Sequence, residues 1–264
     1  MKKYLYLLVF TLCFNNFSYA SYISLNTTLT SSIKDKTLVI SGSTINKGDE
    51  SAHNVKAEIK VQDKDIMSNK ISELKVNGTY TFEEKFNLNL DKPGTYPVIL
   101  TIHYTDANQY PFAALSCQTF SYKKDVVAPI FGQLGSITIS KEGKIKFALK
   151  NFSDKNIKTK TVLVTPRELS VQNSLVQMDL APKYEGSVDF FVKNFSALNK
   201  STYQVYAVSE TEDESAHYTS ISPGIIKVIE IKTIFGLNYT IIVSLLVILI
   251  AVFFAAQFLK KKQN

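Results

Sequence analysis

The sequence predicts an all-β fold class, with two tandem antiparallel β-sandwiches followed by one C-terminal transmembrane α-helix. Three observations predict it. Polar and apolar residues alternate with a period of two through most of the chain. A pattern of residues recurs after about 107 positions, which indicates two copies of one domain. Both ends of the chain carry apolar segments bounded by lysines.

The central part of the chain contains four clear strand patterns. They are KTLVISGSTI, VKAEIKV, TYTFEEKFNL and YPVILTIHY, in which β-branched and aromatic residues alternate with polar ones. Turn-forming residues separate the patterns at Lys47-Gly48-Asp49, Asn77-Gly78 and Asp91-Lys92-Pro93-Gly94. Short strands divided by such turns are typical of an antiparallel sandwich.

The repeat divides the central part into two domains. The matched positions are Gly78 and Gly186, Phe82 and Phe190, and Tyr96 and Tyr203. Asn46 and Asn151 each end a strand pattern and open a loop into the next strand. We therefore expect one sandwich domain over residues 21–124 and a second over residues 125–232.

The first repeat resembles a known class of module. In STINKGDESAHNVKAEIKV, a strand leads into an Asn-x-Gly turn, a small residue and an Asn-Val pair that opens the next strand. The positions concerned are Asn46, Gly48, Ala52, Asn54 and Val55. This run is similar to bacterial immunoglobulin-like modules of the CARDB and NEW3 kind, and GTYPVILTIHY is similar to their late strand. The second repeat departs from the pattern, with Asn151-Phe152-Ser153 at the turn. The resemblance implies immunoglobulin-like, seven-stranded sandwiches that act as spacers, stalks or binding modules, and it implies no chemistry.

The N-terminal segment, residues 1–20, has the features of a cleaved secretory signal peptide. Lys2 and Lys3 precede a short apolar run. Small residues at Ser18 and Ala20 suit cleavage before Ser21. We expect the domains that follow to be exported.

The C-terminal segment has the features of a membrane anchor. Thr240–Leu259 carries no charge and, at about 1.5 Å per residue, is long enough to cross a bilayer as a helix. It is the core of a predicted juxtamembrane and transmembrane segment at 233–259. The basic tail at 260–264 indicates a cytoplasmic C-terminus. We expect a single-pass bacterial cell-membrane protein whose domains are extracytoplasmic, either periplasmic or extracellular.

Charge and cysteine content exclude two classes. Five lysines of the predicted signal and tail account for most of the net charge of +7. Arg167 is the only arginine, and arginine is the preferred residue for phosphate and base contacts, so we expect no nucleic-acid partner. Once Cys13 leaves with the signal, Cys117 is the one cysteine, and no intramolecular disulfide can form. Its strand context predicts a small buried side chain.

The pentapeptide DESAH occurs twice, at 49–53 and at 213–217. The repeat places the first copy between the second and third strands of domain one. It places the second copy between the last two strands of domain two, so the two copies occupy different loops. The acidic side chains around the second copy are candidate ligands for a calcium ion: Glu210, Glu212, Asp213 and Glu214. His217 beside them is a further candidate metal ligand. This loop lacks glycine and the alternating Asp spacing of a calcium loop, so we interpret it as a solvated hairpin and expect no metal and no cofactor.

The remaining candidate residues indicate binding and not catalysis. No nucleophile elbow, metalloprotease helix or related motif accompanies the three histidines, so we expect no enzymatic activity. An aromatic rim around one hairpin could contact a partner or a glycan, and its residues are Tyr104, Asn108, Tyr110 and Phe112. The same rings could instead pack as cross-strand pairs. The absence of tryptophan weighs against a sugar platform.

The sequence thus predicts a non-catalytic, membrane-anchored envelope protein that binds or scaffolds a protein partner. Such a chain could be an accessory subunit of a membrane or surface-polysaccharide system. Ser244, Ala251 and Ala255 share one face of the predicted membrane helix, where small side chains permit close packing against another helix. The alternative is a carbohydrate-binding or adhesion module that uses the Tyr- and Phe-rich loops.

Overall fold

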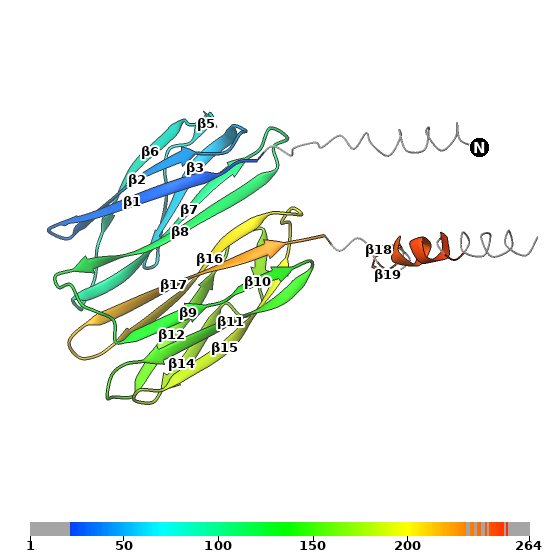
Figure 1. Cartoon of the computed structure of the whole chain (residues 1–264). Coiled ribbons are helices and arrows are strands. Elements are labelled where there is room, and N and C mark those ends of the chain that lie inside the picture. Colours follow the sequence, from blue (N-terminus) through cyan, green and yellow to red (C-terminus); the bar gives the residue numbers. More distant parts are fainter. Residues whose placement is uncertain are drawn as a thin grey trace, which may run out of the picture. The chain divides into compact units, whose positions relative to one another are not determined.

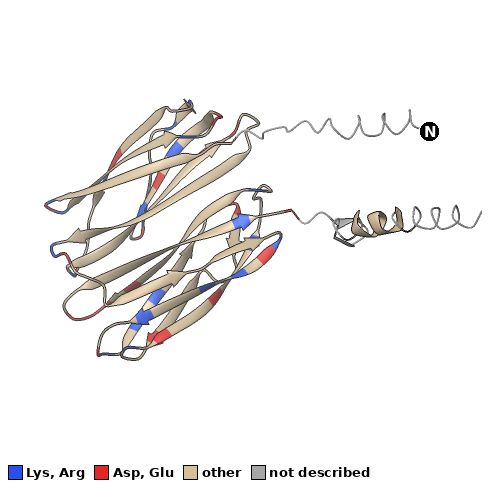
Figure 2. Ribbon diagram, in the orientation of Figure 1, with Lys and Arg blue, Asp and Glu red and all other residues tan. Residues whose placement is uncertain are grey.

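The computed structural model describes residues 22–230 without interruption, and beyond them residues 233–234, 237–238, 241, 243–250 and 252. The described part is all-β except for a short helical stretch at 243–250 (Figure 1). This confirms the prediction of an all-β chain with sandwich-like sheets. Lysines and carboxylates are interspersed along the strands and their loops (Figure 2).

The described chain clusters into two compact units. Unit 1 comprises residues up to Leu90 together with Val98–Gln118, and unit 2 comprises Asp91–Pro97 together with the residues from Thr119 onward. The predicted division after residue 124 assigns residues 91–97 to the first domain, whereas their contacts place them in unit 2.

Unit 1 is built from two antiparallel sheets. Its strands are β1 (Leu25–Lys34), β2 (Thr37–Asn46), β3 (Ala52–Val61), β4 (Lys64–Met67), β5 (Ile71–Leu74), β6 (Thr79–Asn87), most of β7 (Gly94–Thr105) and most of β8 (Pro111–Tyr122). One sheet has the order β1-β2-β6, and in the other β3 pairs with β7, β4 and β5, while β8 pairs with β7. The four predicted strand patterns correspond to β2, β3, β6 and β7. Between the sheets lie apolar side chains that alternate with polar ones along the strands, such as Leu38, Ile40, Ile59, Phe86 and Leu100.

Unit 2 repeats this plan with additional edge strands. Its strands are β9 (Ile130–Leu134), β10 (Ser136–Ile139), β11 (Glu142–Asn151), β12 (Ile157–Val164), β13 (Leu169–Val171), β14 (Leu175–Leu180), β15 (Glu185–Asn194), β16 (Thr202–Glu212) and β17 (His217–Val228). One sheet has the order β13-β15-β11-β9. The other runs β14-β12-β16-β17, with β10 parallel to the C-terminal end of β17. Its core includes Phe147, Phe190, Leu149, Val205 and Ile226.

The two predicted turn asparagines make corresponding hydrogen bonds in the two units. Asn46 ends β2 and Asn151 ends β11, as predicted, and both are fully buried. The Nδ2 of Asn46 donates to the Glu50 carbonyl (2.7 Å), and the Nδ2 of Asn151 donates to the Lys155 carbonyl (2.8 Å), four residues on in each case. Each Oδ1 accepts the backbone N–H two residues later. A buried amide that replaces missing strand partners therefore fixes the turn in both units.

The two DESAH copies lie in different loops, as the repeat predicted. The first copy spans the loop between β2 and β3 and the first two residues of β3, and the second spans the loop between β16 and β17 and the first residue of β17. In unit 1 the loop between β7 and β8, residues 106–110, is the one that corresponds to the second copy. The shared pentapeptide is therefore not a duplicated site.

Both predicted end segments lie mainly outside the described residues. The signal at 1–20 and most of the span Thr240–Leu259, including Ala251 and Ala255, are not described, whereas Ser244 lies in the short helical stretch. Within the described residues, no helix has the length and apolar character needed to cross a bilayer. The short strands β18 (Thr233–Ile234) and β19 (Leu237–Asn238) pair with each other.

Candidate functional site

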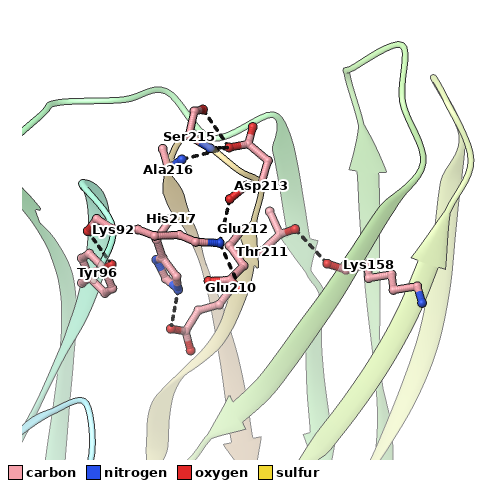
Figure 3. Close-up of polar contacts among 10 residues, drawn as sticks. All are labelled: Lys92, Tyr96, Lys158, Glu210, Thr211, Glu212, Asp213, Ser215, Ala216 and His217. Atoms are coloured by element: carbon pink, nitrogen blue, oxygen red, sulfur yellow. Dashed lines mark hydrogen bonds and ion pairs between the residues drawn. The ribbon is translucent and has the colours of Figure 1, made fainter. Parts of the chain in front are cut away.

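The site is built on the hairpin between β16 and β17, whose loop is the second DESAH copy (Figure 3). The two strands pair antiparallel up to Glu212 opposite His217. Asp213 closes the loop, because its N–H donates to the Ala216 carbonyl at 3.0 Å. Ala216 is buried, which anchors the loop on the unit.

The carboxylate of Asp213 is occupied by its own loop. Its Oδ1 accepts from the N–H of Ser215 (2.7 Å), from the Ser215 hydroxyl (2.7 Å) and from the N–H of Ala216 (2.9 Å). Its Oδ2 accepts from the Tyr218 hydroxyl at 3.1 Å. The hydrogen bond from the Ser215 side chain, with the others, lowers the pKa of Asp213 to about 2. Asp213 therefore acts as the cap of the turn and stays charged at any ordinary pH.

His217 is held on both ring nitrogens and on one ring face. Its Nδ1–H donates to the Thr95 carbonyl at 2.8 Å, and its Nε2 lies 3.4 Å from Glu210 Oε2. Its ring is stacked on that of Tyr96, with centroids 4.2 Å apart and an interplanar angle of 6°. Burial lowers the pKa of His217, but the bonds to Glu210 and Thr95 and the charges of Glu210 and Glu212 outweigh it, so the net pKa is raised.

The segment Asp91–Pro97 brings these partners to the hairpin. The N–H of His217 donates to the Pro93 carbonyl at 2.9 Å, and Gly94 pairs with His217 as a parallel neighbour. Gly94 has a φ of +135°, and a Cβ there would lie 2.0 Å from the His217 carbonyl oxygen. Only glycine allows so close an approach in that conformation.

Lys92 completes the arrangement at the rim of the loop. Its ammonium donates to the Asp213 carbonyl at 2.7 Å and lies 3.3 Å from Glu212 Oε1. The Tyr96 hydroxyl donates to the Lys92 carbonyl at 2.8 Å. Burial, followed by the charges of Glu212 and Asp91, raises the pKa of Tyr96. The hairpin loop is thus tied to a segment that lies about 120 residues earlier in the chain.

A shallow depression of about 700 Å³ adjoins the hairpin on the same sheet of unit 2. It is lined by Lys158, Thr159, Lys160, Gln177, Asp179, Glu210, Thr211, Glu212 and His217. Charges alternate across the strands, since Lys158 on β12 faces Asp179 on β14, and Lys160 faces Glu210 on β16. Within the part of the chain that the structure describes, neither lysine makes an ion pair. The lining offers charges of both signs to a polar ligand or surface.

The five predicted ion ligands have other partners or lie apart. Glu210 is beside His217, Glu212 is beside Lys92, and Asp213 caps the loop. Glu214 is exposed in the loop. Among residues 22–230 and the described residues beyond, no three His, Cys, Asp or Glu side chains converge as a metal site would require. The arrangement of these groups is that of a charge-paired hairpin.

The predicted aromatic rim in unit 1 does come together. The rings of Tyr104 and Phe112 are stacked with centroids 5.5 Å apart, and those of Tyr110 and Phe112 are 5.3 Å apart. Asp106 shapes the turn, because its Oδ1 accepts from the N–H of Tyr110 at 2.8 Å. Asn108 is exposed at the tip of the same turn, and the three rings are half-buried.

The other titratable groups singled out in the sequence lie in strands. The Nε2 of His103 on β7 lies 2.5 Å from the Oε2 of Glu58 on the neighbouring β3. His53 lies at the start of β3. Cys117 on β8 is half-buried, which is less than the buried side chain that its strand context predicts. Its burial raises the pKa of the thiol to about 12, so the thiol is protonated near neutral pH.

Sequence reasoning missed Lys92, Thr95 and Tyr96 as members of the site. The sequence predicts the turn at Asp91–Gly94, but nothing local to it indicates a contact with His217. The Pro93-Gly94 pair is the signal in the sequence that could have raised the question, because glycine allows a close backbone approach, and in the structure Gly94 adopts a φ of +135°.

Comparisons with known proteins give no family for this chain. No family model matches it, and no curated protein matches it. Native α-2-macroglobulin from Escherichia coli is 10% identical, with 79% of this chain and 17% of that chain covered and a TM-score of 0.34. Red sea bream transglutaminase is 10% identical over 79% of this chain and 32% of its own, with a TM-score of 0.28. The seventh ScaB type I cohesin of Pseudobacteroides cellulosolvens is 11% identical over 42% of this chain and 97% of its own, also with a TM-score of 0.28.

This chain spans about a sixth of the length of the macroglobulin that it matches. At these scores the similarity bears on neither the activity nor the ligands of this chain.

Proposed function

We propose that this chain is a non-catalytic, membrane-anchored protein of the bacterial envelope whose immunoglobulin-like units bind a protein partner. The apolar segments at the two ends of the sequence support the anchoring, with the units outside the cytoplasm and the basic tail inside. The partner would be another envelope or membrane protein, and the chain would serve it as an accessory or scaffold subunit.

The observation that carries the proposal is the charged depression beside the 210–217 hairpin. The residues that line the depression lie on strands. The adjoining 213–216 loop is fixed by the hydrogen bonds of Asp213 and by the stacking of His217 on Tyr96. A pre-organised surface loses little conformational entropy on binding. Its alternating charges suit a partner that presents complementary charges in the same spacing.

The position of the hairpin on its strands is also favourable for binding. β17 runs from the 213–216 loop to Val228, and from that end the chain continues toward its predicted span. The twelve residues of β17 place the loop about 40 Å from that end. The depression would thus face away from the bilayer and toward the envelope.

Charge reversal in the depression tests the proposal. Tagged full-length protein is solubilised from membranes of its host in detergent, and a photo-crosslinking residue at Gln177 captures whatever occupies the depression. We expect one partner to be captured by the wild type and its capture to fall at least tenfold with Lys158→Glu and Lys160→Glu together.

A matched control uses two lysines on the other sheet of unit 2. Lys146→Glu with Lys150→Glu makes the same change in net charge on β11 and should leave capture unchanged. Recovery of no specific partner, or equal loss with both double variants, would count against a partner at this surface.

The predicted membrane helix belongs to the same proposal. Ser244, Ala251 and Ala255 would let it pack against a helix of a larger membrane complex. Replacing Ala251 and Ala255 with leucine should then weaken co-purification with that complex without reducing membrane insertion.

A carbohydrate-binding or adhesion role is the second candidate, because the three predicted rings meet in unit 1. Tyr104, Tyr110 and Phe112 form a half-buried aromatic cluster beside exposed Asn108. A glycan array with full-length protein should then show binding that Tyr110→Ala abolishes and Tyr184→Ala, an exposed tyrosine of unit 2, leaves intact. Absence of any glycan signal would remove this candidate.

A further inference from the structure

The end of unit 2 from which the chain continues past Glu230 carries exposed apolar side chains. Phe195 is 77% exposed, Leu198 is 43% exposed and Ile229 is 45% exposed. Large apolar side chains that cluster in solvent mark a surface that contacts something. We call these three residues, with the lysines around them, the exit surface.

Hydrogen bonds join three segments into this surface. The N–H of Asn194 donates to the Lys141 carbonyl at 2.7 Å, which ties the 194–201 loop to the turn between β10 and β11. The N–H of Lys200 donates to the Val228 carbonyl at 2.9 Å, and the N–H of Ile229 donates to the Ile139 carbonyl at 2.9 Å. Both loops are therefore fastened to the point where the chain leaves the unit.

The exposure of Phe195 is enforced by the local structure. Asn194 Oδ1 accepts from the N–H of Ala197 at 2.7 Å, and the N–H of Phe195 donates to the Glu168 carbonyl at 2.9 Å. Ala197 packs against the core of unit 2, so the turn holds Phe195 and Leu198 on its outer side. At the exit, the Asn199 side chain accepts from the N–H of Glu230 at 2.6 Å and donates to its carboxylate at 3.1 Å.

The charge of the exit surface is predominantly positive. Its exposed lysines are Lys141, Lys193, Lys200 and Lys227, and its carboxylates are Glu142 and Glu230. Glu142 already lies 3.8 Å from Lys193, and Glu230 is bonded to Asn199. Apolar side chains flanked by an excess of lysines are the combination that favours an anionic bilayer surface, because the apolar side chains enter the headgroup region and the lysines are attracted to anionic lipids.

The length of the following chain limits how far this surface can be from a membrane. Ten residues lie between Ile229 and the first residue of the predicted span, Thr240, and at most about 3.5 Å per residue they reach about 40 Å. We propose that the exit surface is a membrane-contact surface, which rests on the anionic lipid headgroups beside the anchor and inserts Phe195 and Leu198 between them. This inference rests on the anchoring given under the proposed function.

The chain offers a clean probe, since it contains no tryptophan. Phe195→Trp creates a single emitter in full-length protein, which is reconstituted into vesicles of phosphatidylglycerol and phosphatidylcholine. We expect the emission to shift to shorter wavelength and to fall by about half when the acyl chains are dibrominated. Vesicles of phosphatidylcholine alone, or the Lys141→Glu and Lys200→Glu double variant, should reduce this quenching at least twofold.

Phe131→Trp is the matched control, because Phe131 is 63% exposed and lies opposite Lys150, toward the other end of β11. Its emission should not respond to brominated lipid. Quenching of both tryptophans alike, or of neither, would overturn the inference.

Alkaline carbonate extraction separates this inference from the proposal on which it rests. Protein that carbonate strips from the vesicles would lack the predicted anchor, and the proposed function would fail. Protein that stays embedded while the emission of the Phe195→Trp variant remains unquenched would refute the membrane-contact surface alone. A surface reserved for a protein partner would give this second result in vesicles of pure lipid.

Discussion

At the scale of single residues, His217 is the group whose charge state matters most to the hairpin. When protonated, it donates from Nδ1 to the Thr95 carbonyl and from Nε2 toward Glu210 Oε2, 3.4 Å away. When neutral, the ring carries a proton on only one of its two nitrogens. We expect that nitrogen to be Nδ1, because the Thr95 carbonyl can only accept a hydrogen bond. The protonated form is therefore the better bound one.

The raised pKa of His217 makes the stability of unit 2 depend on pH. The pKa of His217 is higher in the folded protein than in the unfolded chain. The contribution of His217 to the free energy of unfolding is therefore complete below about pH 6.5, and it is lost as the pH rises through the pKa of the folded protein. We expect unit 2 to unfold at lower temperature at pH 8.5 than at pH 6. Glu210→Gln should lower the pKa of His217, flatten this dependence and cost about 1 kcal/mol at pH 6.

Carbon-13 NMR of the His217 ring and thermal unfolding at several pH values would check both parts. The variant His103→Gln supplies a control, since His103 lies in unit 1 and should not alter the pH profile of unit 2. An unchanged profile in Glu210→Gln would contradict the assignment.

At the scale of elements, the approach of the 91–97 segment to β17 depends on one glycine. Gly94→Ala would place a methyl group 2.0 Å from the His217 carbonyl oxygen at a φ that alanine disfavours. We expect a loss of about 2–4 kcal/mol in the free energy of unfolding of unit 2, measured by urea titration.

Gly135→Ala is the matched variant, because the nearest atom to its added methyl group is 3.3 Å away. It should cost far less than Gly94→Ala. Equal effects of the two substitutions would show that the close contact at Gly94 is not what holds the segment on β17.

The turns that follow β2 and β11 depend on a buried amide. Asn151 donates to the Lys155, Leu180 and Ala181 carbonyls and accepts from Ser153. Asn151→Ala would leave these groups without partners in a buried position, at a cost of about 3 kcal/mol in unfolding free energy. Asn46→Ala should have a similar effect in unit 1, and Asn108→Ala, at an exposed loop tip, should be nearly neutral. A small effect of Asn151→Ala on the urea midpoint would contradict this role.

At the scale of the whole molecule, the proposed topology makes a direct prediction. In protease-treated spheroplasts, an epitope after Asn264 should stay protected while an epitope in the exposed 106–110 loop is removed. Disruption of the membrane should expose both. A C-terminal epitope that is cleaved in intact spheroplasts would contradict a cytoplasmic tail.

The strands were predictable because their signal is local. KTLVISGSTI and its three companions alternate in period two, and a half-buried strand requires little more than that. The turns at Asn46 and Asn151 were also visible, since an asparagine that caps a turn acts on residues within four positions.

The site was only partly visible. Acidic residues at 210–214 suggest an ion, but their partners Lys92 and His217 convert them into charge pairs.

The sequence by itself determined the all-β class and the strand positions, because these follow from patterns within a few residues of each other. It also determined the separate loops of the two DESAH copies, because the repeat aligns the strands of the two units. Tertiary structure decided that residues 91–97 join unit 2, that Tyr96 stacks on His217, and that the 194–201 loop is hydrogen-bonded to Val228 at the exit of the chain. These contacts join segments tens of residues or more apart, and they depend on how strand ends pack, which no local pattern encodes. DESAH at 213–217 is therefore a loop whose role is set by the segment that covers it.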